Sequence, residues 1–156
     1  MKRIIIILVF LAVGFLNIYA QNTDTLHYKH GVGFAAGRST GLGIAYLYQP
    51  ENLGIQVVIG AYDDDFNIGL SPMYILARDE MINLFIYSGN SAYYGEKFFY
   101  SPSPDWRIAN SFGVGFEAHQ KQFSFNIMGG IASYYWQHSD WEYGFTLEAS
   151  LLYRLH

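Results

Sequence analysis

Cysteine is absent from the 156-residue chain, and charged residues make up only 14% of it. The absence of cysteine excludes disulfide bonds and a lipid-modified cysteine at a mature N-terminus. Nine Lys and Arg stand against thirteen Asp and Glu, so the basic patch that marks a nucleic-acid partner is not expected. After the first twenty residues, no apolar run reaches the roughly 20 residues that a membrane-spanning helix needs. Aromatic residues, at 19%, and 16 glycines are abundant instead.

The N-terminus has the order of a secretory signal peptide: Lys2 and Arg3, an apolar run over residues 4–16, and a less apolar stretch that ends at Ala20. We therefore predict export by the general secretory route and cleavage after Ala20, with an uncleaved anchor as the alternative. Residues 21–27 form a short N-terminal segment, and residues 28–156 form a single barrel domain. Without residues 1–20 the chain has seven basic and thirteen acidic residues, a net charge of −6.

Residues 143–155 alternate between an apolar and a polar set, and only the period of a β-strand sorts them in this way. The apolar set is Tyr143, Phe145, Leu147, Ala149, Leu151, Tyr153 and Leu155. The other set is Gly144, Thr146, Glu148, Ser150, Leu152 and Arg154. A transmembrane barrel turns its apolar set toward lipid and places tyrosines at the two membrane interfaces. The pattern therefore predicts a lipid-facing strand.

Eight segments of about ten residues have the length of a tilted membrane strand, and most repeat this alternation. They cover residues 28–37, 41–49, 53–62, 66–77, 82–93, 106–119, 122–135 and 142–155. The sequence predicts an all-β fold, an eight-stranded antiparallel up-and-down transmembrane barrel. In residues 82–93, Leu84 and Ile86 compete with Phe85 and Tyr87 for the lipid-facing side. Pro72 predicts a local bulge, because proline cannot donate to a strand ladder.

The connections differ between the two rims, as a membrane barrel requires. Residues 50–52, 78–81 and 119–121 are predicted as short inner turns. Residues 38–40, 63–65, 94–105 and 136–141 are predicted as outer loops, of which only the third is long.

An eight-stranded barrel is just wide enough for its own side chains to fill it, so the inward polar residues predict a hydrogen-bonded, ion-paired plug and no open pore. Arg107 and Arg154 need carboxylate partners, for which Glu117, Glu142 and Glu148 are candidates. The predicted interior set is Lys29, Gln56, Asn67, Ser71, Asn83, Arg107, Ser111, Glu117, His119, Ser124, Asn126, Thr146, Glu148, Ser150 and Arg154.

Glu117, His119 and Ser124 lie on neighbouring predicted strands and on one face, and they are the residue types of a serine, histidine and carboxylate relay. A filled interior leaves no room for a substrate. The structural plug is therefore the preferred interpretation.

His138 and Ser139, with Glu148 downstream, resemble the His-x-Ser arrangement and later glutamate of lipid A deacylases of the PagL type, which are also eight-stranded barrels. The resemblance implies a lipid A-modifying enzyme as an alternative function. Here no residue separates His138 from Ser139, so in an extended segment the two side chains face opposite ways. The residues themselves predict a polar loop tip between Trp136 and Trp141 and no enzymatic activity.

Asp63, Asp64 and Asp65 carry the hard oxygen ligands that divalent cations prefer, including cations that bridge lipopolysaccharide. Their spacing is not that of a calcium loop, and the histidines show no metal-ligand spacing. We predict that these three residues form a solvated turn between two strands, with no metal site and no cofactor.

The long loop of residues 94–105 is the predicted contact surface for an extracellular partner, because exposed aromatic residues stiffened by prolines suit protein recognition. Packing on the barrel rim or within the lipopolysaccharide layer is the other interpretation of these residues, and it is slightly favoured. Its candidate contact residues are Lys97, Phe98, Phe99, Tyr100 and the adjoining Trp106.

The signal peptide, strand count, rim asymmetry and C-terminal strand resemble the small eight-stranded outer-membrane proteins of the OmpA and OmpX type over residues 28–155. That family usually ends on an aromatic residue, whereas this chain ends with Leu155 and His156. The resemblance implies insertion by the barrel-assembly machinery into the outer membrane of a Gram-negative bacterium and contact with outer-membrane lipid and lipopolysaccharide. It also implies no cofactor and a non-enzymatic structural or surface-interaction role. A soluble periplasmic barrel of the lipocalin type, which binds an apolar ligand, requires the two faces to be reversed.

Overall fold

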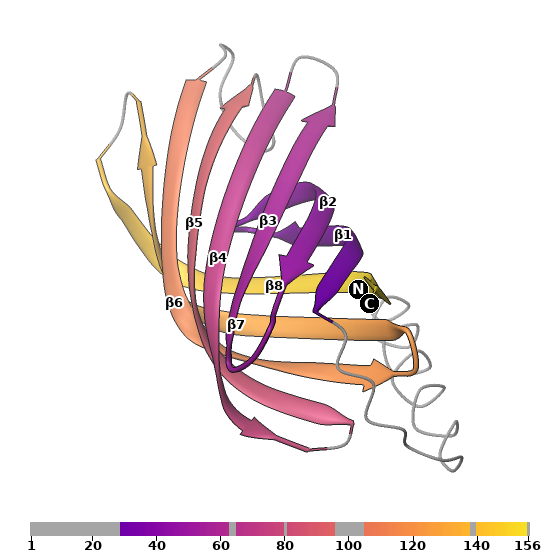
Figure 1. The fold of residues 1–156 in the computed structure, drawn as a ribbon. Coiled ribbons are helices and arrows are strands. Elements are labelled where there is room, and N and C mark those ends of the chain that lie inside the picture. The colour runs from indigo at the N-terminus through magenta and orange to yellow at the C-terminus, as the bar shows by residue number, and fades with distance from the viewer. Residues whose placement is uncertain (1–28, 63–64, 80, 96–104, 138–139, 156) are drawn as a thin grey trace, which may run out of the picture.

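The computed structural model describes residues 29–62, 65–79, 81–95, 105–137 and 140–155, which form a closed antiparallel barrel (Figure 1). Each strand pairs with its neighbour in the chain, and β1 pairs with β8 to close the barrel. The strands are β1 (His30–Gly37), β2 (Gly41–Tyr48), β3 (Leu53–Tyr62), β4 (Asp65–Arg78), β5 (Ile82–Gly95), β6 (Asp105–Gln120), β7 (Phe123–Trp136) and β8 (Glu142–Leu155). The predicted all-β up-and-down barrel is confirmed, and each strand end lies within two residues of its predicted position.

We call the rim that carries the β1–β2, β3–β4, β5–β6 and β7–β8 connections the loop rim, and the rim where β1 starts and β8 ends the terminal rim. Figure 1 shows β1 and β2 as the short strands, whereas β4 to β8 are long and strongly curved. In the described ranges no helix is long and apolar enough to cross a membrane.

The strands are strongly staggered around the barrel. The stagger can be followed from Val32 on β1 by moving from each residue to its partner on the next strand. This path ends at Tyr143 on β8 after Tyr46, Val57, Leu70, Asn90, Asn110 and Ser133. Val32 itself pairs with Tyr153, so one circuit shifts the register by ten residues. With a rise of about 3.3 Å per residue and strands about 4.8 Å apart, this stagger corresponds to a strand tilt of about 40°.

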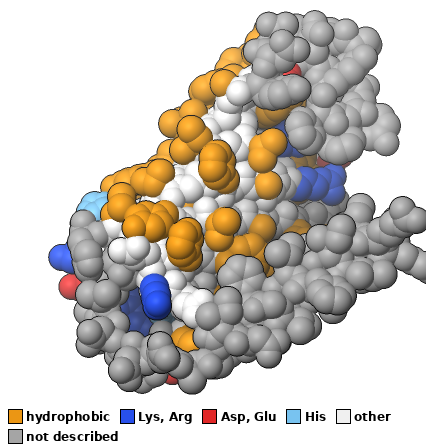
Figure 2. Space-filling view, turned by 90° about the vertical axis from the view of Figure 1, so that its right-hand side faces the viewer, with side chains coloured by type: hydrophobic (Ala, Val, Ile, Leu, Met, Phe, Trp, Pro, Cys, Tyr) orange, Lys and Arg blue, Asp and Glu red, His pale blue; other side chains and the backbone are white. Residues whose placement is uncertain are grey.

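The outward face of the barrel carries exposed apolar side chains on every strand. Figure 2 shows one side of it, where hydrophobic side chains form a broad band and charged side chains lie toward its margins. On β8 the set that begins with Tyr143 points outward, while Thr146, Glu148 and Arg154 are buried, as predicted. On β5 the structure decides the ambiguity: Phe85 and Tyr87 are buried inside, and Leu84 is exposed.

Pro72 does not form the bulge that we predicted. It pairs in register with Ile55 on β3, and the β4–β5 register is the same before it, at Leu70, and after it, at Met73. The ladder to β5 omits pairs beside the proline, so the missing N–H is accommodated without an extra residue. The register shift lies further along β4, between Ile75 and Ala77.

The β1–β2 connection was predicted as an outer loop, but it turns into the barrel. Ser39 and Thr40 are completely buried. A Cβ atom on Gly69 of β4 would lie 2.6 Å from the Thr40 carbonyl oxygen, and one on Gly60 of β3 would lie 1.9 Å from that of Leu42. The backbone of residues 38–42, which we call the hairpin tip, therefore lies against the inner face of β3 and β4, where only glycine permits so close an approach.

The inward turn leaves the barrel wall incomplete at the loop rim. β1 pairs with β8 only as far as Glu148, so residues 142–147, which we call the β8 edge, pair with β7 but have no partner on their other side among the described residues. Tyr143, Phe145 and Leu147 are exposed by 81%, 83% and 70%, the largest values for any big apolar side chain in the described part. We call this break in the wall the notch.

Gly69→Ala tests the inward position of the hairpin tip. The added methyl group must displace the Thr40 backbone, so we expect the free energy of unfolding in urea to fall by about 1–3 kcal/mol, the usual cost of overpacking. Gly129→Ala is the matched control, because the nearest atom to its Cβ would be 3.9 Å away. Equal unfolding midpoints for the two variants would contradict the position of the tip.

Candidate functional site

The barrel interior is filled by side chains of two kinds. Polar side chains form three groups, described below, and an apolar cluster packs among them. The cluster was not predicted, because the inward residues of β4 and β5 did not stand out from the outward ones. Its members are Ala35, Ala45, Leu47, Val58, Met73, Ile75, Phe85, Tyr87, Met128 and Leu152.

The first polar group lies toward the terminal rim and contains a buried ion pair. Arg154 Nη2 lies 3.0 Å from Glu117 Oε1, and both side chains are almost fully buried. Asn83 Nδ2 donates to the other carboxylate oxygen of Glu117 at 2.9 Å, and Arg154 Nη2 donates to Gln49 Oε1 at 2.7 Å. Each charge thus has an opposite charge beside it and one amide hydrogen-bond partner, which reduces the cost of burying the pair. Of the predicted candidates, Glu117 is thus the carboxylate that pairs with Arg154.

The second group is neutral and links three strands. Asn126 Nδ2 donates to Ser150 Oγ at 3.0 Å, and Ser150 Oγ donates to Gln56 Oε1 at 3.1 Å. Asn126 and Ser150 are directly paired residues of β7 and β8, whereas Gln56 reaches across from β3. These bonds tie opposite walls of the barrel together, which a water-filled channel would not allow.

The third group surrounds Glu148, a fully buried carboxyl group on β8. The Ser39 hydroxyl donates to Glu148 Oε1, and Thr146 Oγ1 donates to the same oxygen at 3.4 Å. Ser39 Oγ also lies 2.8 Å from Ser111 Oγ on β6. The hairpin tip supplies Ser39, so the inward turn provides this carboxyl group with a hydrogen-bond partner. In the described part of the chain, no arginine or lysine pairs with Glu148, contrary to our expectation.

Two arginines lie above this group at the loop rim. The Arg107 guanidinium carbon is 5.5, 5.7 and 5.4 Å from the ring centroids of Tyr93, Tyr134 and Trp136, and that of Arg38 is 4.4 Å from Tyr134. Arg107 Nη2 also donates to the Arg38 backbone carbonyl at 3.0 Å. We call Arg38 and Arg107 the arginine pair. Arg38 was not among the predicted site residues, because nothing local in the sequence indicates that its turn folds inward.

Two of the predicted interior residues lie elsewhere or make fewer contacts than expected. Lys29 precedes β1, and its side chain is exposed, so it does not belong to the buried set. His119 is half-buried near the terminal rim, and its Nδ1 atom has no hydrogen-bond partner within the described ranges.

The proposed relay of Glu117, His119 and Ser124 is not assembled by hydrogen bonds. His119 and Ser124 are directly paired residues of β6 and β7. The Glu117 carboxylate, however, is held by Arg154 and Asn83, and Ser124 Oγ has no hydrogen-bond partner among the residues that the structure places. The ion pair competes for the carboxylate that a relay would need to orient the imidazole.

Several predicted site residues lie outside the described residues: His138, Ser139, Asp63, Asp64, Lys97, Phe98, Phe99 and Tyr100. Trp106 is described; it lies at the loop-rim end of β6, exposed, with its ring 5.1 Å from that of Tyr94. Across the described ranges, no three His, Asp or Glu side chains are grouped closely enough to hold a metal ion.

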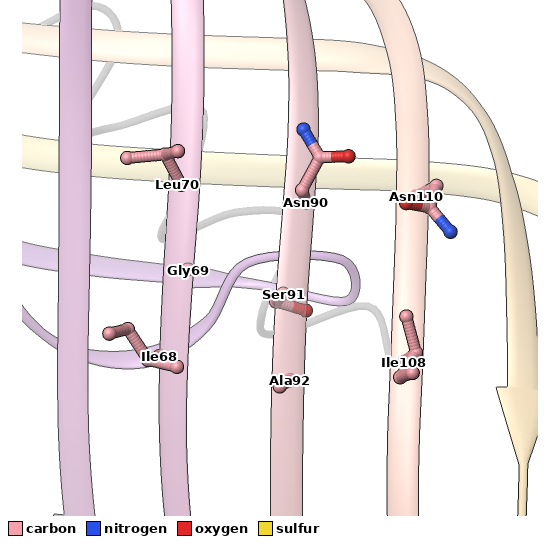
Figure 3. A pocket seen from close by; sticks show the side chains of 8 residues that line it. All are labelled: Ile68, Gly69, Leu70, Asn90, Ser91, Ala92, Ile108 and Asn110. Atoms are coloured by element: carbon pink, nitrogen blue, oxygen red, sulfur yellow. The ribbon is translucent and has the colours of Figure 1, made fainter.

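A shallow groove of about 260 Å³ interrupts the apolar outer face over β4, β5 and β6 (Figure 3). Small residues on β5 form its floor between Leu70 and Ile108, and the paired Asn90 and Asn110 place their amide groups at one end. These asparagines were not among the predicted site residues, although they stand at outward positions of their strands.

Comparison of the chain with protein-family models, curated proteins and solved structures found no match. The geometry of the barrel is therefore the basis for a functional proposal.

Arg154→Met tests the buried ion pair. Removal of the guanidinium leaves Glu117 buried without a counter-charge, so we expect a loss of about 3–5 kcal/mol in the free energy of unfolding. The double variant Arg154→Met, Glu117→Met removes both charges and is expected to recover most of that loss. Urea unfolding of all four members of the double-mutant cycle measures the coupling, and purely additive losses would contradict the pair.

Proposed function

We propose that the protein is an outer-membrane β-barrel of a Gram-negative bacterium, with a structural or surface-interaction role, a filled interior and no catalytic activity. The observation that carries the proposal is the distribution of polarity across the wall. Exposed apolar side chains occur on the outward face of every strand, whereas Glu117, Glu148 and Arg154 are buried inside. This is the arrangement of a barrel whose solvent is lipid.

The height of the apolar face supports the same proposal. On β8, Tyr143 and Tyr153 are ten residues apart and both face outward. Ten residues extend about 33 Å along a strand, and a tilt of about 40° reduces this to about 25 Å along the barrel axis. The apolar band of outer-membrane barrels is about 25 Å tall.

Aromatic side chains meet in pairs near both rims. Tyr94 and Trp106 have ring centroids 5.1 Å apart at the loop rim, and those of Phe123 and Tyr153 are 5.4 Å apart at the terminal rim. The Tyr153 hydroxyl donates to Gln122 Oε1 at 2.6 Å. Rings with a polar atom at the water-facing end are typical of the interface belts of membrane proteins.

The alternative of a soluble barrel that holds an apolar ligand fits these observations less well. Such a barrel keeps its apolar face inward around a cavity, whereas the interior here is crossed by hydrogen bonds such as the one from Ser150 to Gln56. In water, the outward face would be an apolar patch far larger than soluble monomers expose. The barrel-assembly machinery, outer-membrane lipid and lipopolysaccharide are the partners that the membrane proposal implies.

Envelope fractionation is the direct test. The full chain is expressed in a Gram-negative host, and the outer membrane is analysed by gel electrophoresis with and without boiling. We expect a protease-resistant band in the outer membrane whose mobility changes on boiling. Recovery of folded protein in the soluble periplasm would instead support the ligand-binding alternative.

Phe112→Arg tests whether lipid or water surrounds the outward face, because an arginine lowers the stability of the barrel only in lipid. Phe112 lies halfway along β6 and is 57% exposed on the outward face. In lipid, we expect the arginine to cost about 2–4 kcal/mol and to reduce the amount of assembled barrel. The control, Asn52→Arg in the exposed β2–β3 turn, should assemble normally. Normal assembly of Phe112→Arg would argue against a lipid-facing wall, because an exposed position in water tolerates arginine.

A further inference from the structure

The arginine pair combines two like charges at one point of the loop rim. Both guanidinium groups lie over the ring of Tyr134, and the Arg107 side chain is fixed further by its hydrogen bond to the Arg38 carbonyl. In the described part of the chain, neither guanidinium has a carboxylate within salt-bridge distance, and Arg107 Nε has no hydrogen-bond partner. Two adjacent cations held in place by aromatic rings form a prepared site for an anion.

The arginine pair also lies beside the notch. Arg38 follows Gly37, where β1 ends and its pairing with β8 stops. Across the notch, a Cβ atom on Gly144 of the β8 edge would lie 3.5 Å from Arg38 Nη1. Gly144 shares the inward side of β8 with Thr146 and Glu148, so the Arg38 guanidinium lies on the inner side of the β8 edge, next to the break in the wall.

The β8 edge supplies an apolar surface next to these cations. Tyr143, Phe145 and Leu147 project outward from it with the greatest exposure of all the large apolar side chains described. The N–H and C=O groups on the open side of the edge have no strand partner among the described residues, and such groups are costly in lipid unless they are hydrogen-bonded. An occupant of the notch must therefore offer both polar oxygens and apolar chains.

We propose that the notch binds a phosphorylated amphiphile, whose phosphate group lies on Arg38 and Arg107 and whose acyl chains lie along Tyr143, Phe145 and Leu147. Guanidinium groups match phosphate oxygens in charge and geometry and bind them through two parallel hydrogen bonds. The phosphate also provides acceptors for N–H groups of the β8 edge. This inference rests on the proposed membrane location, because the acyl chains reach the β8 edge from the surrounding lipid.

The three tryptophans provide a direct readout, since Trp106, Trp136 and Trp141 all lie at the loop rim and Trp136 contacts Arg107. Residues 21–156 are refolded into phosphatidylcholine vesicles. One set of vesicles contains a small fraction of brominated phosphatidic acid, and the other contains the same fraction of brominated phosphatidylcholine with the same acyl chains. Bromine quenches tryptophan fluorescence only at short range. We expect the acidic lipid to reach half-maximal quenching at about a tenfold lower mole fraction, consistent with hydrogen bonds to a charged group.

Arg38→Gln and Arg107→Gln should each remove most of this preference for phosphatidic acid. Arg78→Gln is the matched control, because Arg78 lies on the terminal rim, where it donates to the Glu51 carbonyl. It should keep the preference unchanged. A gel of each sample with and without boiling shows whether the variant has folded, so loss of the preference is read only from folded barrels.

Other outcomes overturn the inference in distinguishable ways. Equal quenching by the two lipids in a folded, inserted barrel would overturn lipid binding and leave the proposed function intact. Loss of the preference on addition of millimolar inorganic phosphate would assign the arginine pair to a free anion. A chain that does not insert into vesicles would contradict the proposed function itself, and the lipid site with it.

Discussion

The inward turn of the β1–β2 hairpin is the constraint on which the interior and the wall of this barrel both depend. The hairpin tip reaches the inner face of β3 and β4 because Gly60 and Gly69 leave room for its backbone. It brings Ser39 to the buried carboxyl group of Glu148. The same turn takes the end of β1 out of the wall, so that β8 continues beyond Glu148 without a second neighbour among the described residues. A filled interior and an open notch thus have one cause.

The two buried carboxyl groups of the interior are stabilised in different ways. Glu117 has a full counter-charge in Arg154 and an amide donor in Asn83. Glu148 is surrounded by the hydroxyl groups of Ser39 and Thr146. Hydroxyl groups are neutral donors that can rotate toward a carboxyl oxygen, whereas a guanidinium supplies a full positive charge. The hairpin tip thus contributes to the partners of Glu148 but not to those of Glu117.

The strand pattern was predictable because it is local. A period of two residues decides which side of a strand each residue occupies, so the sequence predicts Phe145 and Leu147 outside and Thr146 and Glu148 inside without any knowledge of strand pairing. The pattern failed where the two sides have similar polarity, as at Phe85 and Tyr87 on β5, and there the packing of the interior cluster decides the orientation. It also failed at Pro72, because the effect of a missing N–H depends on which neighbour that position faces.

The sequence by itself determined the eight strands, their order and the two faces of most of them, because alternation and turn composition act over a few residues. Only the tertiary structure decided which charges meet, since Glu117 and Arg154 come from strands that are neighbours neither in sequence nor in the barrel. It also decided the arginine pair and the notch. Both depend on the path of the hairpin tip, and that path requires glycines at distant positions, Gly60 on β3 and Gly69 on β4, as well as Gly41 in the tip. Local periodicity carries no information about such contacts, because they arise only when the closed barrel brings distant strands together.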